Sequence, residues 1–200
     1  MSANVMTMPQ RERTWELPSR GHVAMFALIV AESAIFVIFV VAYLFYLGKS
    51  LTGPTPKEVL EVPIFYSICL LSSSITIHLA VKALRAGNVG SFRAWWFGTI
   101  VLGAAFLYGT AHEWHRLIYK DGLTISTNLF GSTFFTLTGF HGLHVLMGLV
   151  ALGALLGIAM SGRLGAIKPS GFESVAMYWH FVDAVWVVIF TVVYLWPLIA

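Results

Sequence analysis

Two histidines three residues apart, His141 and His144, lie in an apolar stretch that runs from Gly131 to Leu149. Imidazole can bind a metal, transfer a proton or hydrogen-bond a neighbouring helix, and an ionisable side chain within a membrane span is a candidate functional group. The same stretch has four glycines, which are Gly131, Gly139, Gly142 and Gly148. Because glycine lacks a side chain, we expect neighbouring helices to pack closely at these positions.

A second titratable group, His112, Glu113 and His115, ends the third apolar segment. A zinc motif of the HExxH type needs histidines four residues apart, whereas His112 and His115 are three apart. A di-iron site needs carboxylates and Glu-x-x-His pairs from several helices, and only Glu113 with the nearby histidines is dense enough to qualify. The pattern therefore favours a hydrogen-bonded cluster of Glu113 with His141 and His144 over a metal site.

Glu32 is a lone carboxylate inside an apolar run, VAESAIFVIF, with no basic residue three or four positions away. Such a group is either a neutral acid that hydrogen-bonds a neighbouring helix or a functional group, associated with protons or lining a lipid cleft. His180 and Asp183 lie three residues apart on one face of the last apolar segment, so we expect local pairing between them.

The elements that must position these groups are transmembrane helices. The chain has 200 residues, of which 58% are hydrophobic and 10% charged, and its mean hydropathy is +0.81, which is typical of a membrane protein and argues against a nucleic-acid partner. Five segments are long enough to cross a membrane, at about 22–47, 62–84, 94–115, 128–160 and 174–198. We predict an all-α integral membrane bundle of five transmembrane helices over 22–200, preceded by a polar segment, 1–21.

The distribution of positive charge predicts the orientation. Eight lysines and arginines lie on the side of the N-terminus and four on the other, so we expect a cytoplasmic N-terminus and an outside C-terminus. No cleavage-site pattern is present, and we expect the first span to be its own insertion signal. At 1.5 Å per residue, Glu32 is roughly 18 Å from the inner face, whereas His144 is roughly 28 Å from Arg163 and therefore near the outer face. Glu113 is expected there too, within hydrogen-bonding or one-water reach of His141 or His144.

Two long motifs resemble subunit III of the haem-copper respiratory oxidases. They are GSTFFTLTGFHGLHVLMG, which contains both central histidines, and YWHFVDAVWVVIFTVVYLW, which contains His180 and Asp183. The AESAIF context of Glu32, the LLSSSIT run at 70–76 and the Glu113 region agree, so the similarity extends over all five spans. The AHEWHRL sequence around Glu113 departs from many members, which leaves the partners of Glu113 undefined.

The resemblance implies a short, five-helix bacterial subunit, located in the plasma membrane, with no catalytic role of its own. It implies that the chain has no cofactor and no metal, because haem and copper belong to partner subunits. It further implies docking on oxidase subunit I, contact with other oxidase subunits, participation in respiratory supercomplexes, support of proton uptake and lasting turnover, and phospholipids in a cleft. Glu32 matches the family's membrane-embedded glutamate. The polar positions of the last three helices are matched by Glu113, His141, His144, His180 and Asp183.

Two alternatives stay open on the sequence. One is the subunit-III-like accessory protein of bacterial nitric oxide reductases, which has similar motifs. The other belongs to another class and is an independent haem- or metal-binding membrane protein that uses the outer histidines.

Overall fold

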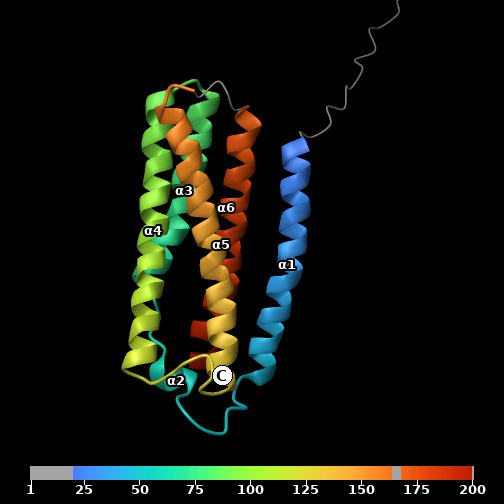
Figure 1. Cartoon of the computed structure of the whole chain (residues 1–200), viewed down its shortest axis with the longest axis vertical. Coiled ribbons are helices and arrows are strands. Elements are labelled where there is room, and N and C mark those ends of the chain that lie inside the picture. Colours follow the sequence, from blue (N-terminus) through green and yellow to red (C-terminus); the bar gives the residue numbers. More distant parts are fainter. Residues whose placement is uncertain (1–19, 164–167, 200) are drawn as a thin grey trace, which may run out of the picture.

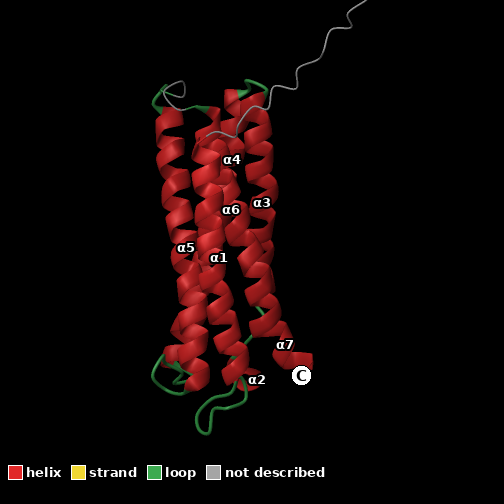
Figure 2. Ribbon diagram, turned by 90° about the vertical axis from the view of Figure 1, so that its right-hand side faces the viewer, coloured by secondary structure: helices red, strands yellow, loops and turns green. Residues whose placement is uncertain are grey.

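The computed structural model describes residues 20–163 and 168–199, which are helical except for the connecting loops (Figures 1 and 2). Five helices in this part of the chain are long and apolar enough to cross a membrane. The elements in chain order are α1 (Arg20–Tyr46), α2 (Pro56–Val59), α3 (Ile64–Arg85), α4 (Val89–Tyr119), α5 (Leu129–Met160), α6 (Pro169–Ile189), the π-helix η2 (Phe190–Leu195) and α7 (Trp196–Ile199). The prediction of an all-α bundle of five long helices is confirmed.

Polar residues set the helix ends, which extend beyond some of the predicted apolar spans. α4 begins five residues before its predicted span because the Asn88 side chain accepts a hydrogen bond from the Ser91 N–H at 3.0 Å. α5 is capped in the same way by Asn128, which accepts from the Gly131 N–H at 2.8 Å. Pro169 starts α6 earlier than predicted, since proline is well tolerated in the first turn.

The short helix α2 is a single capped turn in the loop between α1 and α3. The Thr55 N–H donates to the Glu58 carboxylate at 2.9 Å, and this bond lowers the pKa of Glu58. Close by, Arg116 at the end of α4 forms an ion pair with Glu61 and donates to the Val59 carbonyl at 2.9 Å. The first loop is thereby fastened to the end of α4.

The helices pack so that α6 contacts α1, α3 and α5, while α5 also contacts α4 and α1. α3 and α4 form the most extensive pair. α1 packs mainly against α5 and α6, and it diverges from them towards its N-terminal end (Figure 1). There Glu173 of α6 links the helices, with Arg85 at 2.8 Å and His22 at 3.4 Å.

Serines and a threonine of the LLSSSIT run join α3 to two neighbouring helices. The indole N–H of Trp179 donates to Ser73 at 2.7 Å, and Ser74 contacts two further side chains of α6. Thr76 pairs with Thr99 of α4 at 2.7 Å. One turn earlier on α3, outside the run, Ser67 accepts from the indole of Trp186 at 3.1 Å. Each bond crosses between helices, where lipid offers no competing water.

Glycines provide space for large rings at the centre of the bundle. A Cβ on Gly148 or Gly103 would collide with the Trp179 ring, and one on Gly139 would collide with Trp114. At Gly131 the obstacle is a backbone carbonyl. Close packing of a neighbouring helix is therefore confirmed at Gly139 and Gly148, whereas Gly131 packs against the loop that precedes α5. The expectation is wrong for Gly142, which has no neighbouring helix within contact distance.

The last span changes from α-helix to π-helix over η2 before it ends in α7. Pro197 explains the location of this change, because its ring cannot donate to the carbonyl of Val193 and would clash with it in a regular α-helix. Widening the preceding turn relieves that clash. The wider turn contains Tyr194, whose side chain is buried.

Candidate functional site

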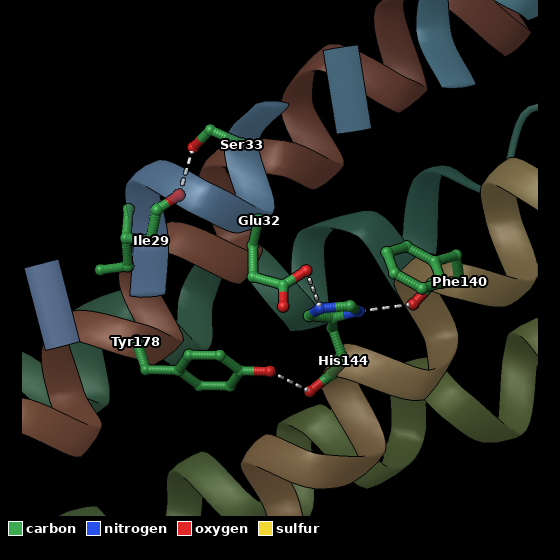
Figure 3. Close-up of polar contacts among 6 residues, drawn as sticks. All are labelled: Ile29, Glu32, Ser33, Phe140, His144 and Tyr178. Atoms are coloured by element: carbon green, nitrogen blue, oxygen red, sulfur yellow. Dashed lines mark hydrogen bonds and ion pairs between the residues drawn. The ribbon is translucent and has the colours of Figure 1, made fainter. Parts of the chain in front are cut away.

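The central contact of the site joins α1 to α5. Glu32 Oε2 lies 3.2 Å from His144 Nε2, and the other ring nitrogen, Nδ1, lies 2.8 Å from the Phe140 carbonyl oxygen (Figure 3). His144 is only 3% exposed. The carbonyl belongs to the residue four positions earlier on the same helix, so α5 itself fixes the orientation of the imidazole ring.

The hydrogen-bond pattern determines how many protons this contact contains. A carbonyl oxygen can only accept, so His144 Nδ1 has a hydrogen and donates it to Phe140. The Nε2···Oε2 contact then requires exactly one proton, either on Glu32 as a neutral acid or on His144 as an imidazolium beside a carboxylate. In both cases the pair has no net charge, which lowers the cost of placing two ionisable groups in a membrane span.

A cavity of about 410 Å³ adjoins the pair between α1, α5 and α6. Its wall is formed by Met25, Leu28, Glu32, His144, Met147, Ala151, Val175 and Tyr178. The Tyr178 hydroxyl donates to the His144 carbonyl at 3.2 Å, on the same side of the pair (Figure 3). This cavity, which we call the chamber, is largely apolar and has one carboxyl and one imidazole in its wall.

The predicted depth of His144 is wrong. It is the sixteenth of the 32 residues of α5, and it contacts Glu32 of α1 instead of lying beside Glu113 near the outer face. The count from Arg163 assumed that helix ends are level with the membrane surface. α5 has 32 residues and is ~48 Å long, so its ends project beyond the hydrocarbon core. α1 moreover begins below the ends of the other helices (Figure 1).

His141 lies one turn before His144 but in a different environment. Its ring stacks on Trp186 at a centroid distance of 5.2 Å and meets the edge of Phe106 at 5.8 Å. It is 1% exposed, and neither ring nitrogen has a hydrogen-bond partner among the described residues. Glu113 was expected within hydrogen-bonding or one-water reach of His141 or His144, and a direct hydrogen bond to His141 is not formed.

Glu113 instead joins α4 to the π-helix. The Tyr194 hydroxyl donates to Glu113 Oε2 at 2.9 Å, while the buried Oε1 has no partner within the described part of the chain. Trp186 contacts both His141 and Tyr194, so aromatic rings occupy the space between His141 and Glu113. The expected cluster is divided into separate contacts.

The expected pairing of His180 with Asp183 is not formed, because each of them contacts Ser74 of α3. Ser74 donates to Asp183 Oδ2, and Ser74 Oγ lies 3.0 Å from His180 Nδ1. Asp183 is 3% exposed, whereas His180 faces outward from the bundle. The three side chains form one continuous hydrogen-bonded chain from the core to the surface.

Sequence reasoning missed the two tyrosines and the two tryptophans that complete these contacts. Tyr178, Tyr194, Trp179 and Trp186 are each buried, and each donates a hydrogen bond to another helix. Three of them follow each other at helical spacing in the last span, which was a usable signal, because buried tyrosine and tryptophan normally find a polar partner.

The described residues contain no group of three or more histidine, cysteine, aspartate and glutamate side chains placed to hold a metal ion. The expectation that this chain has no metal or cofactor remains a prediction.

Comparison with known proteins identifies the family. Residues 20–198 match the family described as cytochrome c oxidase subunit III. Cytochrome c oxidase subunit 3 of Synechocystis is 42% identical over 171 residues, covering 84% of this chain and 72% of the relative. The proteins of the same name from Thermostichus vulcanus and Corynebacterium diphtheriae are each 34% identical, covering 90% and 94% of this chain and 89% and 94% of their own lengths.

The match spans all five long helices, including the Glu32, His144 and Asp183 contacts. Both the five long helices and the relatives indicate a multi-pass membrane protein. This chain belongs to the cytochrome c oxidase subunit III family and is an accessory subunit of an oxidase.

Proposed function

We propose that this chain is the subunit III of a proton-pumping terminal oxidase that reduces oxygen to water, docked in the membrane on subunit I. In this role it supports proton uptake and lasting turnover without taking part in oxygen chemistry. The observation that carries the proposal is the Glu32–His144 pair, which contains one proton beside an apolar chamber within a chain of this family.

The chamber supports a lipid-binding role. Most of its wall is aliphatic side chains from α1, α5 and α6, which suit an acyl chain. Met25 and Leu28, from the N-terminal half of α1, line the cavity, and α1 diverges from α5 and α6 towards that end (Figure 1). A phospholipid would lay an acyl chain against these residues, with the headgroup near the helix ends.

The paired proton supports a role in proton handling. Moving the proton between Glu32 and His144 changes no net charge, and the Coulomb attraction within the ion-paired form offsets part of the desolvation of its two charges. We infer that Glu32 acts through this equilibrium or through contact with bound lipid, and that it is not a catalytic residue.

The orientation proposal places the N-terminal end of α1 on the cytoplasmic side of a bacterial plasma membrane. Support comes from the basic residues of the described chain that gather at that end of the bundle, which are Arg20, Lys82, Arg85, Arg93, Arg163 and Lys168. Arg11 and Arg13, which contributed to the same prediction, lie outside the described residues.

The deciding experiment is to purify the complex through an affinity tag on this chain and record its redox difference spectrum and metal content. Haem together with copper, and oxygen consumption, are expected. Haem without copper would indicate a nitric oxide reductase partner. Stoichiometric haem or iron in the isolated chain would overturn the accessory role and favour an independent metal-binding protein.

A further inference from the structure

One outward-facing surface of the bundle is polar where lipid tails would otherwise cover it. Ser74 and His78 lie one turn apart on α3, and His180 and Asp183 lie opposite them on α6. Both histidines are exposed. We call these four residues the α3–α6 patch.

The patch lies at the middle of both spans. Ser74 is the eleventh of the 22 residues of α3, and Asp183 is the fifteenth of the 30 residues from Pro169 to Leu198. His78 and His180 are four and three residues away from these midpoints, or about 6 Å and about 4.5 Å along the axis. The hydrocarbon core extends ~15 Å on either side of the bilayer centre, so lipid headgroups lie well beyond reach of these rings.

The hydrogen bonds within the patch leave one polar atom to be satisfied from outside. Ser74 has a single hydrogen and donates it to Asp183, so its oxygen accepts from His180 Nδ1–H. A neutral imidazole with its proton on Nδ1 has a free lone pair on Nε2. In lipid this exposed nitrogen would have no partner, which is costly, whereas ionisable groups in membrane spans normally face protein or water.

We propose that the α3–α6 patch docks against a transmembrane helix of another subunit of the oxidase, which presents a hydroxyl or amide donor to His180 Nε2. This inference rests on the proposed function for the existence of that subunit. An apolar groove of about 320 Å³ lies next to the patch between α1 and α6, and Ala184, one turn after His180, lines it. The groove is lined mainly by apolar side chains, among them Phe181, Val185 and Val188 of α6, which suit aliphatic side chains of the same partner.

The outer surface of α1 provides the contrast. Its exposed side chains are apolar, with Phe26 and Ile38 both 64% exposed, as expected for a helix surrounded by lipid tails. A partner helix on this side of α1, which does not line the groove, would gain nothing that lipid does not already supply, whereas one on the patch would satisfy a polar atom.

Photo-crosslinking in the intact complex tests the proposal. Benzoylphenylalanine at Leu71 and at Val187, exposed positions seven residues from His78 and His180 respectively, should form adducts with another protein subunit after illumination. The same residue at Ile38 should form lipid adducts only. Lipid adducts alone at Leu71 and Val187, or adducts with a second copy of this chain, would overturn the proposal.

A matched pair of variants gives an independent measurement. His180→Leu should lower retention of the chain in the detergent-purified complex about threefold, the effect of losing one interhelical hydrogen bond in a membrane. Thr191→Val is the control, because Thr191 is also exposed on the last span but donates to the Val187 carbonyl of its own helix at 2.8 Å. Equal retention of both variants would refute the donor contact. The contact would also be refuted if the isolated His180→Leu chain lost enough thermal stability to account for its lower retention.

Failure of the proposed function would be recognised separately. In that case the tagged chain would co-purify with no haem-containing subunit, a result obtained before illumination. If no haem-containing subunit co-purifies and Leu71 and Val187 still form adducts with another protein, that protein is not an oxidase subunit and the proposed partner is refuted.

Discussion

Two polar contacts at mid-span, one between α1 and α5 and one between α3 and α6, differ in their surroundings. Glu32 and His144 meet through a single 3.2 Å contact at the edge of a cavity, on a helix with few buried side chains. α3 and α6 are joined by successive bonds to Ser67, Ser73 and Ser74, in a tightly packed region. The first contact is open to a ligand, whereas the second is mainly structural.

The difference follows from what each helix can bury. α3 presents Ser67 and Ser73 to α6, so the N–H groups of two large indoles find acceptors there. α1 is apolar on nearly all sides, and its buried residues are only Phe36 and Tyr43. Its position therefore depends on a few aromatic contacts and on the Glu32–His144 pair, and space remains beside it.

The largest expected effect is on the α3–α6 side. Trp179→Ala removes a fully buried indole that fills the space over Gly103 and Gly148, and it should lower the free energy of unfolding by about 3–5 kcal/mol. Trp95→Ala is the control, because Trp95 is 43% exposed to the surroundings of the bundle. Thermal unfolding of the complex in lipid nanodiscs measures the stability of both variants. Equal melting temperatures would show that the packing of Trp179 contributes no more to stability than that of Trp95.

A smaller loss of stability should follow from Ser74→Ala. This change leaves the buried Asp183 carboxyl without its hydrogen-bond donor, which costs about 1–3 kcal/mol. Ser33→Ala makes the same chemical change where the hydroxyl donates only to the Ile29 carbonyl of its own helix at 2.7 Å. If the two serine variants unfold at the same temperature, the hydrogen bond from Ser74 to Asp183 contributes no more to stability than the bond of Ser33 within its own helix.

On the α1 side we expect changes in ligand occupancy with little loss of stability. Ala151→Phe places a ring in the cavity beside Glu32 and should reduce the number of phospholipids retained per complex, as counted by native mass spectrometry. Ala104→Phe, at an exposed position of α4, should leave that number unchanged. An unchanged lipid count in Ala151→Phe would show that the cavity is not a lipid site.

The smallest effect is expected for Glu32→Gln. The amide can donate to His144 Nε2 in place of the carboxyl proton, so assembly and the initial rate of oxygen reduction should be nearly normal. Glu32→Leu leaves Nε2 without a partner and should shorten the active lifetime during turnover, which prolonged oxygen-electrode recordings would measure. Immediate loss of turnover in Glu32→Gln would contradict the accessory role.

The sequence by itself determined the membrane class, the five spans and the family, because hydropathy and long local motifs are properties of consecutive residues. It also identified Glu32, His144 and Asp183 as residues of interest, since ionisable groups are rare in apolar runs. Their partners were not predictable in the same way. Glu32 and His144 are 112 positions apart, and a count along each helix assumed level ends that α1 and α5 do not have.

Only the tertiary structure decided which polar groups meet. It separated His141 from His144, although one turn joins them, because α5 presents the first to Trp186 and the second to α1. It divided the expected Glu113 cluster by inserting aromatic rings from the last span. Apolar periodicity places each helix in the bilayer, but the rotation and height of one helix against another depend on side-chain packing across the whole bundle.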